Sequence, residues 1–353
     1  MNRHLFISAL LCAALALGCS PGAEREEQRG EDVDALGEAS LAGDVGAQSA
    51  EVSPRGQEVE EVLEVGDKAQ EETELWSFAS CPEDEALGGF QVLLAEAYTG
   101  ASGQVLSGIV PANVPELVRS QQGCRLLKAR SLYCDPQCVP GETCGESGDC
   151  IDYPSRISLG EVQVSGLKEP LVMEAKWGNT YTNQGTLPHP GYEVGAKLSL
   201  EAEGGELEGF SLRGRGVEYL EPLDEEVTLT RGEELTLGWV SPGPREHTKL
   251  RITLNVNNHG STSAWLSCEV EDSGTFSVPA LLLDALLDIG VSGFPSLSLT
   301  RLSADAFRSS IGCVEFSVRS ERDVAISVTG LTSCTSDQQC PLGESCGSDL
   351  SCH

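Results

Sequence analysis

A duplicated cysteine motif constrains the fold of this chain more than any other feature. The text C-x-x-G-E-[ST]-C-G-x4-C occurs at Cys138–Cys150 and again at Cys340–Cys352, and one further cysteine precedes each copy. Segments this short have no hydrophobic core, so we expect disulfides to hold them, each worth about 2–4 kcal/mol. The two modules span residues 131–152 and 333–353. Their cysteines are Cys134, Cys138, Cys144, Cys150, Cys334, Cys340, Cys346 and Cys352.

Zinc is the alternative occupant of these modules. A tetrathiolate zinc site favours two close C-x2-4-C pairs, whereas most gaps between the module cysteines are five residues long. Thiols exported to an oxidising compartment also tend to pair. We therefore expect disulfides and no metal. Three connectivities are open within each module, and the sequence does not choose among them.

The first nineteen residues read as an export signal. Arg3 is followed by an apolar stretch from Leu5 to Leu17 that is too short for a permanent membrane span. Its end, Ala16-Leu17-Gly18-Cys19, resembles the lipobox of bacterial lipoproteins, which implies that Cys19 becomes the lipidated N-terminus. Ser20 resembles an outer-membrane sorting signal. The alternative is ordinary cleavage after Ala14-Leu15-Ala16, which gives a secreted protein without an anchor.

Cysteine parity favours the lipid anchor over ordinary cleavage. The chain has 14 cysteines, and Cys12 leaves with the signal, so thirteen remain. If Cys19 carries lipid, the other twelve can all pair.

Charge excludes one class of partner and marks a tether. The formal net charge of −32 argues against a nucleic-acid binder, which needs clustered Lys and Arg. Residues 20–75 hold seventeen Asp or Glu against four Lys or Arg and no aromatic residue. Such a segment buries too little apolar surface to fold. We expect a disordered acidic tether that stands extended through charge repulsion.

The remaining chain is expected to be mainly β. Residues 76–130 predict a small β domain of a few strands. Residues 156–332 alternate apolar and polar positions in many short runs, best seen in 250–256, which predicts an antiparallel sandwich or jelly roll. One helix is expected after Pro279 and before Gly290.

Four cysteines lie in the two β-rich regions, and we expect them to pair within these domains. Cys81 and Cys124 lie near the two ends of the small β domain, which predicts that one disulfide closes it. Cys268 and Cys313 lie on two predicted strands of the sandwich, where a second disulfide would join them. With two disulfides in each module, the prediction is six.

The second module, C-T-S-D-Q-Q-C-P-L-G-E-S-C-G-S-D-L-S-C, resembles the short cysteine-rich modules of myxobacterial surface lipoproteins, of the Dickkopf N-terminal or EGF-like class. The order of lipobox, acidic spacer, module, β-rich domain and terminal module is similar to uncharacterised members of that group. The resemblance implies a cell-surface interaction protein and carries no activity with it.

The residues supply no catalytic set. The chain lacks H-E-x-x-H, P-loop and G-x-G-x-x-G motifs, and it has no EF-hand loop for calcium. We expect no cofactor. We expect a ligand-binding loop at 176–195, where Trp177, Tyr181, His189 and Tyr192 lie among amide side chains, because a sugar-contacting loop would use aromatic faces beside amide groups. The competing reading packs these rings into the sandwich.

These observations favour a non-enzymatic binding protein, anchored by lipid at the outer membrane or cell surface, whose partner is an extracellular carbohydrate or protein. One alternative is a hydrolase of envelope polymers that uses carboxylates on the sandwich, in which case two acids should lie about 5–10 Å apart. A second alternative is a structural scaffold.

Overall fold

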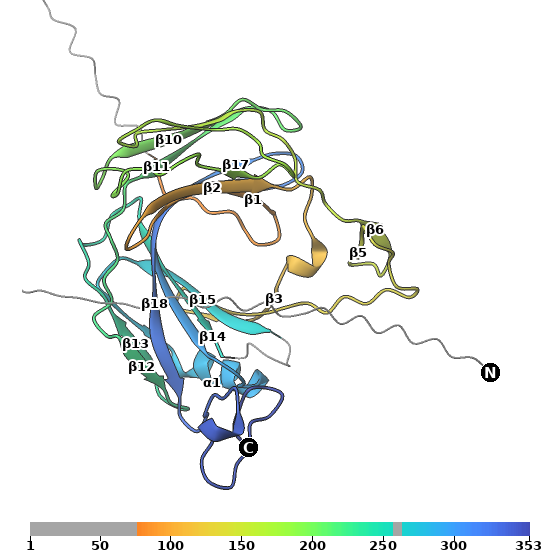
Figure 1. Ribbon diagram of the computed structural model, residues 1–353, viewed down its shortest axis with the longest axis vertical. Coiled ribbons are helices and arrows are strands. Elements are labelled where there is room, and N and C mark those ends of the chain that lie inside the picture. The colour runs from red at the N-terminus through yellow and green to blue at the C-terminus, as the bar shows by residue number, and fades with distance from the viewer. Residues whose placement is uncertain (1–75, 257–262) are drawn as a thin grey trace, which may run out of the picture. The chain divides into compact units, whose positions relative to one another are not determined.

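The computed structural model describes residues 76–256 and 263–353, and their fold is mainly β, as predicted (Figure 1). The predicted signal, Cys19 and the predicted acidic tether lie outside the described residues. Among the described helices, none has the length and apolar character to cross a membrane. The one α-helix of the described part is α1 (Ala280–Ile289), which begins after Pro279 and ends before Gly290, so the predicted helix is confirmed.

A ten-stranded sheet forms the centre of the fold, and most of its neighbouring strands are antiparallel. Two pairs are parallel, β1 with β18 and β12 with β18. In sheet order the strands are β3 (Glu116–Gln121), β4 (Cys124–Lys128), β15 (Ala264–Glu271), β14 (Lys249–Asn255), β17 (Ser296–Arg308), β18 (Cys313–Val328), β1 (Ala86–Leu94), β2 (Thr99–Val105) and β9 (Tyr181–Thr182), with β12 (Glu226–Leu229) on the far half of β18.

The prediction that residues 76–130 form a small domain of their own is wrong. Strand β1 pairs with β18, and β4 pairs with β15, so both hairpins of this segment extend the sheet built by residues 249–328. The physical reason is that two hairpins alone bury little apolar surface and leave unpaired edges. Joining a larger sheet satisfies the edges and covers the apolar side chains of β1.

A four-stranded sheet packs over part of the large one to make a sandwich. Its order is β11 (Phe210–Arg215), β10 (Lys197–Ala202), β7 (Val162–Ser165) and β8 (Leu171–Met173). Side chains of β17, in the large sheet, bind the backbone of β11, which is an edge strand of the four-stranded sheet. Asp305 accepts from the Arg213 N–H at 2.9 Å, and Ser303 accepts from the Arg215 N–H at 3.0 Å. The two sheets are therefore joined by hydrogen bonds as well as by packing.

The remaining strands are short. β13 (Leu235–Gly238) pairs with β16 (Thr275–Val278), and β5 (Glu142–Cys144) pairs with β6 (Cys150–Asp152) in the first module. Two 3-10 helices complete the described elements, η1 (Pro111–Asn113) and η2 (Asp337–Gln339).

Two hydrophobic cores share the long strands β17 and β18. In the first half of β18, Phe316 and Val318 face the four-stranded sheet in core one. In its second half, Val324 and Val328 lie in core two, together with the buried leucines of α1. All four of these β18 residues occupy even positions of an alternating strand, so one face of β18 serves both cores.

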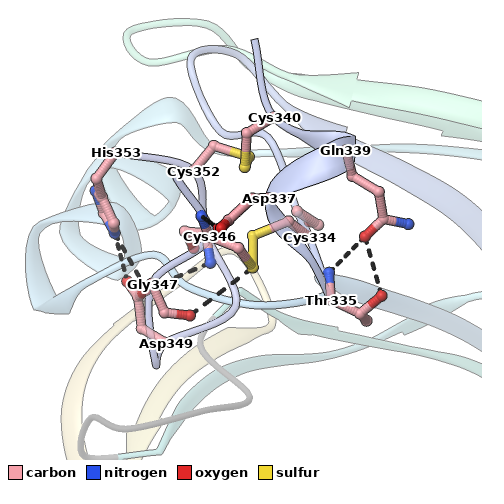
Figure 2. The surroundings of a disulfide bond; sticks show 12 residues. Cys334, Thr335, Asp337, Gln339, Cys340, Cys346, Gly347, Asp349, Cys352 and His353 are labelled. Atoms are coloured by element: carbon pink, nitrogen blue, oxygen red, sulfur yellow. Dashed lines mark hydrogen bonds and ion pairs between the residues drawn. A yellow bond between two sulfur atoms is a disulfide. The ribbon is translucent and has the colours of Figure 1, made fainter. Parts of the chain in front are cut away.

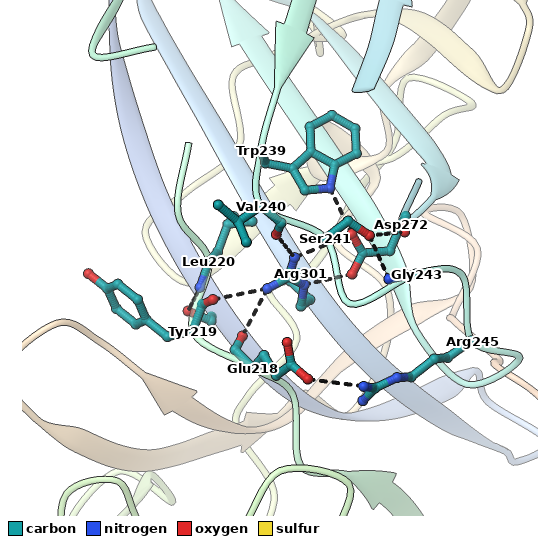
Figure 3. A network of polar contacts seen from close by, with 11 residues as sticks. Glu218, Tyr219, Leu220, Trp239, Val240, Ser241, Gly243, Arg245, Asp272 and Arg301 are labelled. Atoms are coloured by element: carbon teal, nitrogen blue, oxygen red, sulfur yellow. Dashed lines mark hydrogen bonds and ion pairs between the residues drawn. The ribbon is translucent and has the colours of Figure 1, made fainter. Parts of the chain in front are cut away.

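A buried ion pair lies on the face of β17 that points toward the two cores, and it binds segments on both sides of the strand (Figure 3). Arg301 is 1% exposed and pairs with the fully buried Asp272, with 2.6 Å between Nε and Oδ2. The Arg301 guanidinium also donates to the carbonyls of Glu218, Tyr219 and Val240. Because Trp239 Nε1 donates to Asp272 at 2.7 Å as well, the buried charges are fully paired and hydrogen-bonded.

All twelve cysteines in the described residues form disulfides. Both modules join their first cysteine to the third and the second to the fourth, which resolves the three open connectivities. The module pairs are Cys134–Cys144, Cys138–Cys150, Cys334–Cys346 and Cys340–Cys352. In the second module, the Asp337 carboxylate accepts from the Cys346 N–H at 2.8 Å, beside the Cys334–Cys346 bond (Figure 2).

The two predicted disulfides between the other cysteines are wrong. Cys81 bonds to Cys313 and Cys124 bonds to Cys268. Cys124 lies directly opposite Cys268 on the paired strands β4 and β15, with 3.8 Å between the Cα atoms. Cys81 shortly precedes β1, whose parallel partner β18 begins at Cys313. The prediction failed because it assumed two separate domains, whereas strands of residues 76–130 pair with strands of residues 249–328.

Candidate functional site

The predicted aromatic loop does not form a site. Tyr181 is fully buried in β9, where its hydroxyl accepts from the Leu159 N–H at 2.8 Å. Tyr192 is 2% exposed and lies in core one. Both rings pack into the sandwich, where burial of their large apolar surface stabilises core one. The binding-loop prediction is therefore wrong for these two residues.

The other two residues of the loop lie at the surface but do not complete a cluster. Trp177 is fully exposed at the tip of a turn closed by the bridge between Lys176 and Thr180. His189 is exposed, and its ring nitrogens lie 3.3 Å from Thr99 Oγ1 and 3.0 Å from the Glu96 carbonyl. The two exposed residues are therefore separated from the two buried rings, and the four predicted residues do not form one surface.

A polar face of the ten-stranded sheet replaces that loop as the candidate site. Side chains of adjacent residues in a strand point to opposite faces, so the strand registers define a face opposite the two cores, which we call the open face. Its polar residues include Gln91, Ser102, Gln104, Thr182, Lys249, Arg251, Thr253, Glu269, Glu271, Ser298, Thr300, Glu315, Ser317, Arg319 and Glu321. The same registers also place Trp265 and the buried Leu302 and Ala304 on this face.

One half of the open face is hollowed into a groove of about 570 Å³. Strands β18, β1, β2 and β9 form its floor, and Cys81 stands at its wall. This volume is within the usual range of small-ligand sites, roughly 300–1,000 Å³. The polar residues that line the groove include Gln91, Ser102, Gln104, Thr180, Thr182, Glu315, Ser317 and Arg319.

Hydrogen bonds position several of these side chains. Gln91 Nε2 donates to Ser102 Oγ at 3.1 Å across the β1–β2 pair. Gln104 Oε1 accepts from Arg156 Nε at 2.6 Å, so its amide is held at the rim. Arg319 differs, because its buried Nε atom has no hydrogen-bond partner among the described residues.

Glu315 is the one carboxylate among the groove residues. Its Oε2 accepts from the Cys81 N–H at 3.1 Å. Burial raises the pKa of this carboxyl above its ordinary value, and Glu269 adds to the rise, while Arg251 and Arg319 act in the opposite direction. The net result is a carboxyl that holds its proton to higher pH than an exposed glutamate.

Strand β18 bends between its two halves, so the ten-stranded sheet is curved (Figure 1). Through Thr300, Arg251 is in register with Glu321, six residues further along β18 than Glu315.

Charge on the open face is largely compensated. Arg251 pairs with Glu269 at 3.2 Å, and Lys249 pairs with Glu271. Arg125 pairs with Glu83 through two contacts of 2.6 Å, which ties residues 76–85 to β4. The face is therefore polar without a strong charge of either sign, although the whole chain carries −32.

Neither module fits a metal. Three sulfur atoms in each module lie within 4.8 Å of one another, but they do so because they belong to the adjacent disulfides Cys134–Cys144 and Cys138–Cys150, and Cys334–Cys346 and Cys340–Cys352. A disulfide sulfur is not the thiolate that binds zinc.

Sequence reasoning missed the groove because its residues come from distant segments. The alternation Phe90-Gln91-Val92 marks Gln91 as the polar side of a strand, and Phe316-Ser317-Val318 does the same for Ser317. That signal exists in the sequence. It does not reveal that the two strands are neighbours, and so it could not assemble a site.

Comparisons with known proteins add no family. No protein-family model matches the chain, and no curated protein matches its sequence. A solved structure of a Ca2+-stabilised adhesin, with which an Antarctic bacterium binds ice, aligns with a TM-score of 0.16 and 8% identity over 71% of this chain. The chain spans about half of that structure, 51% of its length. Similarity this low supports neither a shared fold nor a shared function.

Proposed function

We propose that the chain is a non-enzymatic binding protein, anchored by lipid on Cys19 at the outer membrane or cell surface, and that the open face of its sheet meets the ligand. The observation that carries the binding function is the groove: a polar, charge-compensated hollow with hydrogen-bonding side chains from four adjacent strands. Such a surface fits recognition of a polar extracellular ligand.

The oxidised cysteines support the location. All twelve cysteines of the described residues are paired, and the remaining two are Cys12, within the export signal, and Cys19 at the lipobox-like sequence. Disulfides of this density are typical of exported proteins. Loss of the signal leaves Cys19 as the one cysteine without a disulfide role, which is what an acyl anchor requires.

Labelling with a palmitate analogue, followed by membrane fractionation, tests the anchor. The full chain should carry label and fractionate with the outer membrane, whereas Cys19→Ala should lose both. Cys12→Ala is the matched control, because it alters a cysteine of the signal without removing the acceptor. A wild-type chain that stays soluble with an unmodified Cys19 would refute the anchor.

The hydrolase alternative has one favourable observation, the raised pKa of Glu315, which is a property of general acids. Glycoside hydrolysis usually needs a second carboxylate, and Glu315 is the one acid among the groove residues. Glu269, whose charge also acts on Glu315, is already paired with Arg251.

A reducing-end assay on any retained polysaccharide separates the two functions. A binding protein returns the polymer intact, and Glu315→Gln leaves that result unchanged. New reducing ends that disappear in Glu315→Gln would establish the hydrolase instead. The scaffold alternative predicts that no envelope polymer or protein is retained by the purified chain.

A further inference from the structure

We propose that the groove on strands β18, β1, β2 and β9 binds a neutral saccharide chain, with the partly exposed guanidinium of Arg319 donating to a sugar oxygen. This inference rests on the proposed binding function and names its ligand class. It depends on the shape of the floor, its donors and acceptors, and its charge.

A glycine shapes the floor of the groove. Gly89 pairs with Gln104 on one side and with Glu315 on the other. A Cβ at Gly89 would lie 2.1 Å from the Glu315 carbonyl oxygen, so the backbones of β1 and β18 approach too closely for a side chain at this position. The close approach of the two strands at the groove therefore requires glycine.

The lining both donates and accepts hydrogen bonds. Gln91 and Gln104 carry amides, Ser102 and Thr182 carry hydroxyls, and all four face the same space. Sugar hydroxyls also donate and accept, so a polyhydroxylated ligand matches this mixture better than a ligand with acceptors alone.

Arg319 supplies the independent observation. Its Nε is buried and has no partner among the described residues, and its guanidinium approaches Glu321 only at 3.7 Å. A guanidinium has five N–H donors, and a carboxylate contact of 3.7 Å leaves donor capacity on this one. Because the side chain is about one-third exposed, a ligand oxygen in the groove can reach the exposed part of the guanidinium.

Charge and polarity exclude other ligand classes. Arg319 and Glu315 bring opposite charges to the groove. The formal net charge of the whole chain is −32, which repels polyanions. Apolar ligands lack a surface, because the two aromatic residues at the floor, Phe90 and Tyr181, are 3% and 0% exposed and face core one. A neutral, hydroxyl-rich chain is the class that remains.

Titration calorimetry and a neutral-glycan array, both with the full-length chain, test the proposal. The calorimetric probes are neutral hexasaccharides of glucose, xylose and N-acetylglucosamine, with hexagalacturonate as the anionic comparison. We expect at least one neutral series to bind and the anionic probe to bind at least about tenfold more weakly. Failure of the wild-type chain to bind any neutral glycan, or preferential binding of hexagalacturonate, would overturn the proposal.

Three variants locate the site. Ser102→Trp should abolish binding by filling the groove, and Arg319→Lys, which keeps the charge but lacks the planar guanidinium donors, should weaken it about tenfold. Arg231→Ala is the matched control, since this exposed arginine pairs with Asp288 far from the groove residues in sequence and fold. Unchanged affinity in both groove variants, with wild-type circular dichroism and unfolding temperature, would refute the site.

The outcomes separate this inference from the function on which it rests. If the Ser102→Trp protein still retains an envelope component in a pull-down, the chain is a binding protein that uses another surface, and the groove assignment is wrong. If the wild-type chain retains nothing and binds no glycan, the binding function itself fails.

Discussion

The two faces of the ten-stranded sheet have the same strands but opposite chemistry. On β18, Phe316 and Val318 are buried against the four-stranded sheet, while their neighbours Ser317 and Arg319 line the groove. The core face holds the fold through apolar burial and one fully satisfied ion pair. The open face carries pairs that are partly exposed and balanced in charge. One face determines stability, and the other is free to recognise a ligand.

The largest expected effect is on the core face, at the buried ion pair. Arg301→Met leaves the buried Asp272 carboxylate without its cation, so the free energy of unfolding should fall by about 3–5 kcal/mol. Denaturant unfolding followed by circular dichroism measures it. Adding Asp272→Asn should recover part of the loss, because the orphaned charge is then gone. A change below about 1 kcal/mol in the single variant would show that the pair is not buried.

Adjacent residues of β14 compare the two faces directly. Ile252 is 1% exposed in core two, whereas Thr253 points to the open face. Ile252→Ala should cost about 2–5 kcal/mol through lost burial and the cavity it leaves. Thr253→Ala, its control on the same strand, should cost no more than about 1 kcal/mol. Equal losses in the two variants would contradict the assignment of faces.

The open-face ion pairs should contribute little to stability. Arg251 and Glu269 are each about one-third exposed, so Arg251→Ala should lower the free energy of unfolding by at most about 1 kcal/mol. The loss should shrink further in high salt, because solvent ions screen exposed charges. Thermal unfolding at low and high ionic strength checks this, and a large, salt-independent loss would mean that the pair is structural.

The smallest expected effect is a pH-dependent gain at Glu315. Burial raises the pKa of this carboxyl in the folded state above its unfolded value. Its protonated form therefore favours folding at low pH, and that contribution is lost as pH rises through the folded-state pKa. Glu315→Gln mimics the protonated form, so it should unfold at a higher temperature than the wild type at pH 7 and at a similar temperature near pH 3. A variant that is less stable at pH 7 would contradict the cause assigned to the shift.

Local signals in the sequence were reliable, and non-local ones were not. Pro279 and Gly290 predicted both ends of α1. The cysteine motif predicted two disulfides in each module, without their connectivity. The alternation at 250–256 predicted β14 because side-chain period is a property of one strand. Aromatic composition misled at Tyr181 and Tyr192, since the same rings serve either a core or a binding surface.

The missing information was strand pairing between distant segments. The Cys81–Cys313 bond joins residues 232 positions apart, and β1 lies parallel to β18 with a comparable separation. No local pattern specifies such a neighbour. The groove shares this property, because Gln91 and Ser317 approach each other only through that pairing.

Disulfide mapping by mass spectrometry of the non-reduced full-length chain tests most directly whether residues 76–130 and 249–328 build one sheet with a core face and an open face. The structure predicts peptides that join Cys81 to Cys313 and Cys124 to Cys268. Peptides that join Cys81 to Cys124 and Cys268 to Cys313 would instead show two separate domains, and the groove floor on β1 and β18 would not exist.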